Sequence, residues 1–305
     1  MTNVTPTHEM PPGSPPAEIH IDEALVRELL QSQHPDLAEV QIKQLEPGFD
    51  NEMFRLGNDY AIRLPRRAVA ASCIENEQRW LPELTQRLPL PISAPVRIGH
   101  ADDGYPWSWS IVPWIEGKAA DLGYPADDQA EVLVGFLKAL HQPAPEDAPI
   151  NHVRGVPIPT LAEINEERMA RLLESTESIN PQVFQAWTEG LAAPVDTKPT
   201  WLHADLHARN VLVSDGCITA IIDWGDITSG DRATDLASIW TLLERPEARR
   251  RAIRAYAEND DALLVRARAW AVLFGVALLD TGIIDNRRHA EMGRCILERV
   301  TEDMS

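Results

Sequence analysis

The sequence predicts an α+β protein with two lobes, a small β-rich N-terminal lobe and a larger α-helical C-terminal lobe. Its 305 residues and 44% hydrophobic content are enough for two buried cores. Short strand-like apolar runs lie mainly before residue 112, whereas helical apolar patterns dominate after residue 118. We therefore expect a disordered tail over residues 1–17, an N-terminal lobe over 18–112, a hinge over 113–117 and a C-terminal lobe over 118–305.

The overall composition limits the compartment and the classes of partner. Residues 1–17 carry five prolines and little apolar bulk, which is typical of a disordered tail. The net charge of −19 disfavours nucleic acid and anionic lipid, and it favours cationic ligands through long-range attraction. The three cysteines lie far apart, no apolar run approaches membrane-spanning length, and the N-terminus has no signal pattern. We expect a cytoplasmic protein without a nucleic-acid or membrane partner, and its oligomeric state is not readable.

The N-terminal lobe combines strands with two helices. Apolar stripes predict helices over residues 18–33 and 68–88. Short apolar runs predict strands over residues 40–45, 52–56, 60–64, 96–99 and 107–112. The turn over residues 45–51 contains Gly48, and its backbone amides near Asn51 suit an anion. An ordinary hairpin loop has the same composition, so this alternative stays open.

The C-terminal lobe is predicted to be mostly helical, with one hairpin. Helical apolar patterns cover residues 125–141, 161–176, 181–191, 236–243 and 262–281. Two apolar runs, residues 211–213 and 218–222, flank a Ser-Asp-Gly turn at 214–216, which is typical of a β-hairpin.

Three oxygen-bearing side chains surround this hairpin. Asp205 is followed by Asn210 five positions later, and Asp223 comes thirteen positions after Asn210. A hairpin brings its outer ends together, so Asn210 and Asp223 should lie side by side, with Asp205 just before them. Amide and carboxylate oxygens suit Mg²⁺, and a further carboxylate can orient an attacking hydroxyl and accept its proton. The pattern therefore indicates phosphoryl transfer from a nucleotide.

Two alternative interpretations of this segment remain. Acidic residues at strand ends often cap helices or satisfy turns without any chemistry. His203, Asp205 and His207 alternate along a strand, so they would share one face and could bind zinc in a metallohydrolase. That alternative leaves the downstream hairpin unexplained.

The residues from Trp201 to Asn210 and from Ile221 to Asp226 resemble the catalytic segments of the aminoglycoside phosphotransferase and choline kinase-like family. The family's motif is His-Gly-Asp-x-x-x-x-Asn, followed by a strand that ends in Ile-Asp-Trp. Ala204 here replaces the usual glycine, a change that we expect to be minor. The resemblance implies a protein-kinase-like fold, ATP or GTP as phosphoryl donor, Asp205 as catalytic base, and Asn210 and Asp223 as Mg²⁺ ligands.

The same resemblance implies roles for residues of the N-terminal lobe. Arg63 occupies the strand position of the phosphate-binding lysine, although Arg66 and Arg67 are close by, and Glu77 resembles its partner glutamate. Asn51 would contact the phosphates. In the hinge, the carbonyl of Pro113 would accept from adenine and the amide of Ile115 would donate to it. A solvated helix face for Glu77 and a hinge loop without ligand are the alternatives.

Supporting and acceptor-binding residues follow from the resemblance as well. His203 and Asp235 would hold the catalytic loop by hydrogen bonds. Acidic residues of the C-terminal lobe would bind ammonium groups of the acceptor, unless they are merely solvated: Asp231, Glu163, Glu166 and Glu167. A cationic small molecule with a hydroxyl group is therefore the favoured acceptor, and an aminoglycoside kinase the favoured function. A macrolide kinase, a kinase of a cellular metabolite, and a non-catalytic nucleotide-binding pseudokinase are the alternatives.

Overall fold

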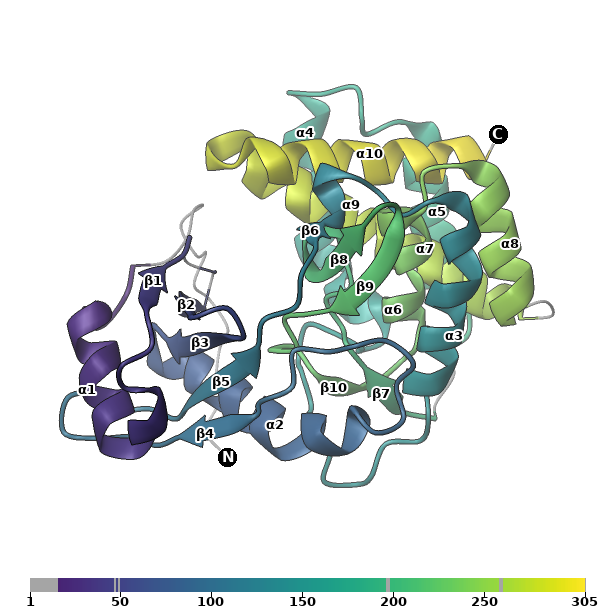
Figure 1. Cartoon of the computed structure of the whole chain (residues 1–305). Helices are drawn as coiled ribbons and strands as arrows, with labels where there is room; N and C mark the ends of the chain where they lie inside the picture. Colours follow the sequence, from purple (N-terminus) through teal and green to yellow (C-terminus); the bar gives the residue numbers. More distant parts are fainter. Residues whose placement is uncertain (1–15, 47, 49, 196–197, 258–259, 305) are drawn as a thin grey trace.

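The computed structural model describes residues 16–46, 48, 50–195, 198–257 and 260–304, and Figure 1 shows their arrangement in two lobes. The predicted disordered tail lies outside the described residues except for Pro16 and Ala17. Two residues of the turn expected over the phosphates, at positions 47 and 49, also lie outside them.

The small lobe is built on one antiparallel five-stranded sheet in the order β1-β2-β3-β5-β4. The helix α1 (Glu23–Gln33) begins where the Asp22 side chain accepts the Leu25 N–H at 2.9 Å, five residues after the expected start. The strands are β1 (Ile42–Gln44), β2 (Asn51–Leu56), β3 (Tyr60–Pro65), β4 (Arg97–Gly99) and β5 (Trp109–Pro113). The second helix, α2 (Ala68–Leu84), lies between β3 and β4 in sequence.

The large lobe is mostly helical, as predicted from the sequence. Its α-helices are α3 (Ala130–Leu140), α4 (Ala162–Leu173), α5 (Pro181–Ala192), α6 (Ala233–Leu236), α7 (Ser238–Leu242), α8 (Pro246–Ala257), α9 (Asp261–Asp285) and α10 (Arg287–Asp303). Two small sheets accompany them, one of β7 (Thr200–Leu202) with β10 (Thr228–Gly230) and one of β6 (Lys118–Ala119), β8 (Val211–Ser214) and β9 (Cys217–Ile221). Short 3₁₀ segments are η1 (Pro35–Leu37), η2 (Ala120–Leu122), η3 (Asp127–Gln129), η4 (Ile158–Leu161) and η5 (Ala208–Asn210).

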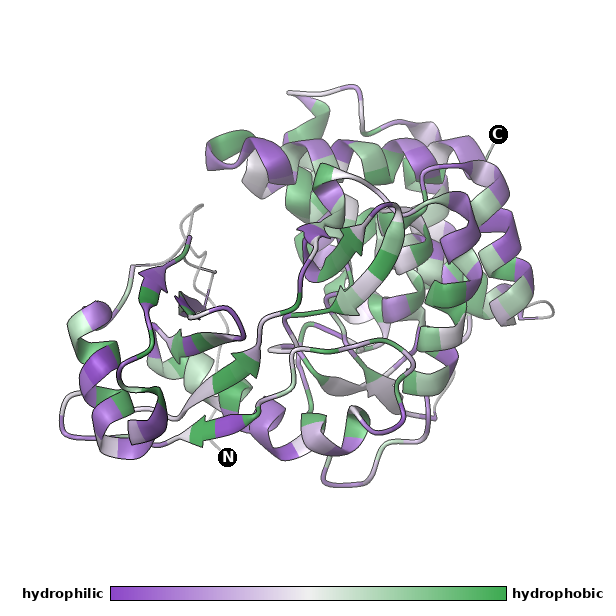
Figure 2. Ribbon diagram, viewed as in Figure 1, coloured by the Kyte–Doolittle hydropathy of each residue, from purple (hydrophilic) through white to green (hydrophobic). Residues whose placement is uncertain are grey.

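Two hydrophobic clusters correspond to the two lobes. The smaller one joins α1 to the sheet, with Phe54 and Trp109 fully buried. The larger one surrounds α9 and includes Leu81 and Leu84 at the end of α2. The last turns of α2 therefore pack on the large lobe, so this helix links the two cores. Figure 2 shows hydrophilic and hydrophobic stretches alternating along α8 and α10, as expected for helices with one face in the core.

The central helix α9 is longer and more apolar than we expected. By length and composition it would be able to cross a membrane, since it has 25 residues and an 18-residue window of mean hydropathy 1.8. Of that window, 72% is buried inside the protein, where α9 packs against α5 and α10. A core helix surrounded by other helices passes the same compositional test.

Candidate active site

The loop that the sequence predicts to be catalytic follows β7 and is held by a buried carboxylate. Asp235, in α6, is fully buried and accepts the backbone N–H of His203 at 2.8 Å and of Ala204 at 2.7 Å. The His203 ring contacts the Ile222 carbonyl at 3.0 Å and accepts the Asp205 N–H at 3.3 Å. Asp235 and His203 therefore make hydrogen bonds to this loop, and their supporting role in catalysis stays a prediction.

The substitution at position 204 is less innocuous than the sequence suggested. Ala204 has φ of +72°, in the left-handed region that glycine adopts without strain. An alanine in this region costs on the order of 1 kcal/mol. The two hydrogen bonds to Asp235 hold the loop in this conformation in spite of that cost.

The predicted hairpin is present and brings three side chains together. β8 pairs with β9 in the register Val211↔Ile221, and the Ile222 N–H donates to the Asn210 carbonyl at 2.9 Å. This pairing places Asn210 and Asp223 on neighbouring chain segments. The Asn210 Nδ2 donates to the carbonyl of Asp205 at 2.9 Å and to its Oδ2 at 3.1 Å, which fixes Asp205 beside them.

These side chains line a cavity of about 420 Å³ between the lobes. Among the residues expected to bind the donor or carry the chemistry, seven line this cavity: Asn51, Arg63, Pro113, Ile115, Asp205, Asn210 and Asp223. Glu77 lies behind Arg63 and is fully buried. Glu163, Glu166, Glu167 and Asp231 do not belong to this lining.

Arg63 joins the two lobes through a buried ionic network. Its Nη1 donates to Glu77 Oε2 at 2.6 Å, and its Nη2 donates to Asp223 Oδ1 at 3.1 Å. Burial raises the pKa of Glu77 to about 7 although the Arg63 charge opposes this. Burial acts to lower the pKa of Arg63, but the Glu77 and Asp223 carboxylates outweigh it and raise that pKa. The forked guanidinium contacts both acids at once, which a single ammonium group would do less well.

Cations flank both oxygens of Asp205. His207 Nε2 lies 3.3 Å from Oδ2, and Arg154 Nη2 lies 3.4 Å from Oδ1. Burial opposes ionisation, yet the charges of His207 and Arg154 hold the pKa of Asp205 well below its usual range. Burial would lower the pKa of His207, but the Asp205 carboxylate outweighs it and raises that pKa. Asp205 is therefore an ionised carboxylate in an electropositive setting.

A further basic pair lies in the same cavity. Arg209, in η5, and His289, in the first turn of α10, both line it, and Arg209 Nη1 lies 2.7 Å from His289 Nε2. Burial, and then the Arg209 charge, lower the pKa of His289 to about 4, so His289 is neutral near pH 7 and accepts from Arg209. The sequence analysis missed Arg154, Arg209 and His289, because nothing in their local sequence connects positions so far apart.

The sequence matches the phosphotransferase enzyme family over residues 41–270. The chain belongs to this family. The match spans both lobes and includes the catalytic loop and the hairpin, so the geometry described above belongs to a phosphotransferase with a protein-kinase-like fold. No curated protein matches the chain significantly.

Solved structures of other phosphotransferases share the fold. A GDP complex of wild-type aminoglycoside 2′-phosphotransferase-IIIa has a TM-score of 0.68 at 19% identity, covering 93% of this chain and 99% of that one. The macrolide 2′-phosphotransferase MphH from Brachybacterium faecium has a TM-score of 0.58 at 20% identity, covering 89% and 97%. A macrolide 2′-phosphotransferase type I has a TM-score of 0.57 at 19% identity, covering 90% and 97%.

The acidic residues expected to bind a cationic acceptor lie elsewhere in this phosphotransferase. Asp231 accepts from Arg266 Nε at 2.7 Å and Nη2 at 3.1 Å, and both side chains are only 2% exposed. This corrects the expectation for Asp231, because a buried carboxylate already neutralised by an arginine is not free for a ligand. Glu163, Glu166 and Glu167 are exposed on α4, where Glu166 accepts from the Trp187 ring N–H at 3.3 Å.

The side chains around Asp205 fit Mg²⁺ better than zinc. Both hydrogen bonds from Asn210 Nδ2 are directed to Asp205. The other amide atom of Asn210, Oδ1, therefore faces no partner in this pair and is left for another one. Asp223 is 57% exposed, and only its Oδ1 contacts Arg63. An amide and a carboxylate oxygen are suited to Mg²⁺. Within the described ranges, no three His, Cys, Asp or Glu side chains converge, so the His203–Asp205–His207 zinc site finds no support.

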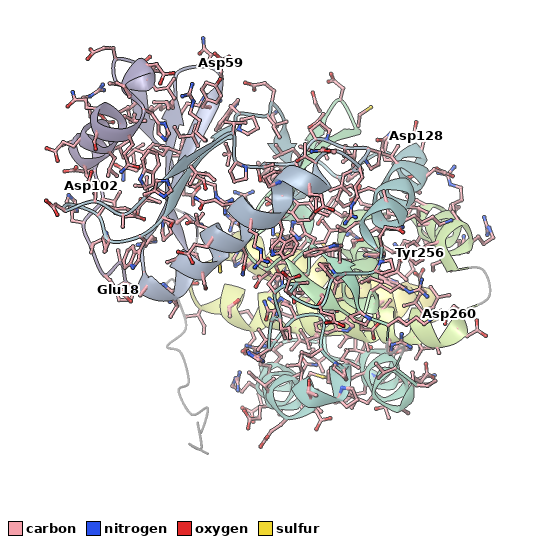
Figure 3. The ribbon with its side chains drawn as sticks, turned by 90° about the horizontal axis from the view of Figure 1, so that it is seen from below. Glu18, Asp59, Asp102, Asp128, Tyr256 and Asp260 are labelled. Carbon is pink, nitrogen blue, oxygen red and sulfur yellow. The ribbon has the colours of Figure 1, made fainter. Side chains whose placement is uncertain are left out.

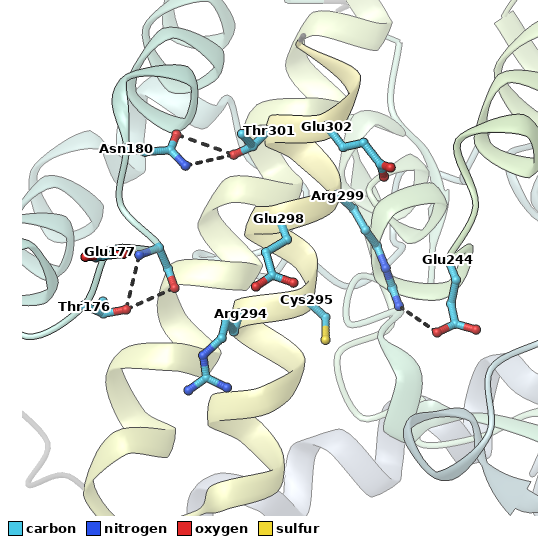
Figure 4. A pocket seen from close by; sticks show the side chains of 11 residues that line it. Thr176, Glu177, Asn180, Glu244, Arg294, Cys295, Glu298, Arg299, Thr301 and Glu302 are labelled. Atoms are coloured by element: carbon cyan, nitrogen blue, oxygen red, sulfur yellow. Dashed lines mark hydrogen bonds and ion pairs between the residues drawn. The ribbon is translucent and has the colours of Figure 1, made fainter.

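A second, larger cavity of about 920 Å³ lies away from this chemistry. Figure 4 shows it along α10, where Glu298 and Arg294 project beside Cys295. Burial raises the pKa of the Cys295 thiol, which makes this cysteine a poor nucleophile. The Arg299–Glu244 contact on its rim is 4.0 Å. This second cavity shares no lining residue with the cleft between the lobes.

Proposed function

We propose that this protein transfers the terminal phosphoryl group of ATP or GTP to a hydroxyl group of a small molecule, with Mg²⁺. The observation that carries the proposal is the convergence of Asp205, Asn210 and Asp223 at one cleft, opposite Arg63. If these acidic residues only capped helices or satisfied turns, there would be no reason for all four side chains to line one cavity.

The donor fits the cleft from the hinge to Arg63. Apolar side chains of Val112, Leu212 and Ile222 line it and provide a slot for a purine base. Pro113 and Ile115, in the hinge over residues 113–117, would supply a carbonyl acceptor and an amide donor to that base. Related structures include GDP and ADP complexes, which supports a nucleotide donor here. A cytoplasmic location, where ATP and Mg²⁺ are abundant, belongs to the same proposal.

Asn210 and Asp223 would hold Mg²⁺, which neutralises charge on the phosphate oxygens when it is bound. Arg63 would bind phosphate with the edge that faces the cleft, and Glu77 would keep its guanidinium in place. Asn51, which lines the cleft at the start of β2, would approach the phosphates from the small lobe.

Asp205 would orient the acceptor hydroxyl. As the new O–P bond forms and the bond from phosphorus to the bridging oxygen breaks, the hydroxyl proton passes to Asp205 and the nucleoside diphosphate leaves. The low pKa of Asp205 keeps it ionised and ready to accept the hydroxyl hydrogen bond, so alignment contributes more than basicity.

The acceptor is sought with a panel of hydroxyl compounds. Related structures include an aminoglycoside phosphotransferase with kanamycin and a macrolide phosphotransferase, so both compound classes belong in the panel. An aminoglycoside was expected partly from acidic residues that do not line the cleft, so hydroxyl metabolites belong in the panel too.

The test measures nucleoside diphosphate release across this panel, with Mg²⁺ and with EDTA. We expect Mg²⁺-dependent turnover with at least one acceptor. In Asp205→Asn, transfer should fall by roughly 10²–10⁴-fold while the affinity for Mg²⁺–ADP is retained. Tight Mg²⁺–ATP binding without turnover on any acceptor would instead indicate a pseudokinase. Transfer at the wild-type rate in Asp205→Asn would remove Asp205 from its role.

A further inference from the structure

The loop after β7 places a permanent positive charge in the cleft, on Arg209, that makes no ion pair with an acid among the described residues. Arg209 lines the cavity, and its one side-chain contact among the described residues is with His289 at 2.7 Å. A guanidinium carries five N–H donors and no acceptor, so one contact to an imidazole nitrogen leaves most of its donors available. Other arginines of the large lobe, such as Arg266 and Arg288, are paired with carboxylates.

The end of a helix adds positive potential beside Arg209. His207 is already paired with Asp205 at 3.3 Å, so it does not supply an acid for Arg209. The first turn of α10, which carries His289, presents the positive end of the dipole of a 17-residue helix. Asp285 is exposed at the end of α9, and its charge acts to raise the pKa of His289, against the effects of burial and of Arg209.

This local charge runs against the character of the whole protein. With 47 acidic and 28 basic residues, the molecule has a net charge of −19. Figure 3 shows acidic residues on both lobes, among them Glu18 and Asp59 on the small lobe and Asp128 and Asp260 on the large one. An arginine in the cleft without an acidic partner among the described residues therefore contrasts with the overall charge of the protein, and it attracts anionic ligands.

The position of Arg209 assigns it to the acceptor. Arg63 and Asp223 define the side of Asp205 where the donor phosphates would lie. Arg209 and His289 come from η5 and α10, on the large-lobe wall of the cavity, whereas Arg63 lies on the small-lobe wall. The Arg209 N–H donates to the ring of His207 at 3.3 Å, and His207 contacts Asp205. A hydroxyl in contact with Asp205 would therefore carry its neighbouring substituents past Arg209.

We propose that Arg209 and His289 form a subsite for an anionic group of the acceptor, a phosphate, sulfate or carboxylate close to the reacting hydroxyl. The subsite rests on the proposed function, since it is defined relative to the hydroxyl that Asp205 orients. Arg209 binds the anion through charge-assisted hydrogen bonds. The same charge repels a polycation such as an aminoglycoside. Arg209 would therefore favour anionic acceptors and also disfavour cationic ones.

Inorganic sulfate is the probe for this subsite, because it is a tetrahedral dianion that requires no knowledge of the acceptor. The full chain is loaded with Mg²⁺ and either ADP or the β,γ-imido analogue of ATP, and sulfate is titrated at constant ionic strength by calorimetry. We expect saturable binding with both nucleotides, about tenfold or more weaker in Arg209→Gln. Arg250→Gln is the matched control, since Arg250 is half-exposed on α8 and pairs with Glu247.

A charge reversal keeps the test decisive if one variant folds poorly. Arg209→Glu should abolish sulfate binding and increase the affinity for kanamycin by about tenfold, a gain that unfolding cannot produce. Circular dichroism and Mg²⁺–ADP affinity report folding in each variant.

Four results would overturn the subsite. Two of them are an absence of saturable sulfate binding and equal sulfate affinities in Arg209→Gln and the wild type. The third is tighter binding of kanamycin than of sulfate by the wild type. The fourth is sulfate binding that the imido analogue of ATP blocks and ADP does not. The last result would show that Arg209 serves the terminal phosphate of the donor. Failure of the proposed function is separate, because it would appear as lost Mg²⁺–nucleotide binding or absent turnover while sulfate still binds.

Discussion

Where we propose that the donor binds, Arg63 lies between two carboxylates. Where we propose that the acceptor binds, the one side-chain hydrogen bond of Arg209 among the described residues is with His289. Both are arginines on the wall of the same cavity. The Arg63 side chain is 5% exposed. Its ion pair with Glu77 lies within the small lobe, and its ion pair with Asp223 connects the small lobe to the segment after β9.

The difference shows two uses of one side chain. A buried arginine with two acidic partners is fixed in position, so it can present a constant edge to a ligand without moving. An arginine without an acidic partner keeps its electrostatic attraction for a ligand that brings its own negative charge. The first arrangement favours alignment of a donor common to many enzymes, and the second favours choice among acceptors.

The largest effect should come from breaking the donor-side network. Arg63→Met leaves the fully buried Glu77 without its counter-charge, so we expect a loss of about 3–5 kcal/mol in the free energy of unfolding. Urea denaturation of the nucleotide-free protein measures this loss. A loss under about 1 kcal/mol would mean that the network does not hold the lobes together.

A second buried pair should behave like the first in stability but not in binding. Asp231→Asn removes the partner of Arg266, where both side chains are 2% exposed, so we expect a loss of about 3 kcal/mol. At a temperature where the variant is folded, acceptor KM should stay within twofold of the wild type. A selective rise in acceptor KM would return Asp231 to the role that we expected from the sequence.

The donor-side network should also give stability a defined pH dependence. The folded-state pKa of Glu77 is about 7, above its ordinary value of 4.5. Between these values the folded state binds a proton that the unfolded state releases, so the contribution of Glu77 to stability falls as pH rises. The wild type should lose stability relative to Glu77→Gln between about pH 5 and pH 7. Parallel denaturation curves for the two proteins over this range, measured with EDTA, would contradict this.

The smallest effect should come from the acidic face of α4. Glu163 and Glu167 are exposed and do not line the cleft, so Glu163→Gln with Glu167→Gln should change stability by less than about 0.5 kcal/mol. Acceptor KM should be unchanged. A clear increase in KM for a cationic acceptor would place a binding site on α4 and weaken the contrast between the two sides of the cleft.

The predictability of the site follows the same division. Asn210 and Asp223 were predictable because a tight hairpin with its Ser-Asp-Gly turn determines where its ends meet, a local property of the chain. Arg63 and Glu77 were proposed from their resemblance to a strand and the helix that follows it, and the structure brings them within 2.6 Å. Fold class followed from the change of apolar periodicity near the hinge.

The proposed acceptor side depends on long-range packing that local patterns do not encode. Arg209 contacts His289, 80 positions away, because α10 begins beside η5. The start of α10 is also tied to η2 by the ion pair of Arg288 with Asp121. Asp231 is neutralised by Arg266 of α9, a helix whose apolar sequence gave no sign of a buried ion pair. The strain at Ala204 was missed because a residue type does not reveal its φ.

The most direct test of this division is one set of affinities for Mg²⁺–ADP and for sulfate, measured in Arg63→Lys and Arg209→Gln. Lysine cannot contact Glu77 and Asp223 as a fork, so Arg63→Lys should weaken Mg²⁺–ADP binding by about tenfold and leave sulfate binding within about twofold. Arg209→Gln should show the reverse pattern. Equal weakening of both ligands by either variant would contradict a cleft with separate donor and acceptor sides.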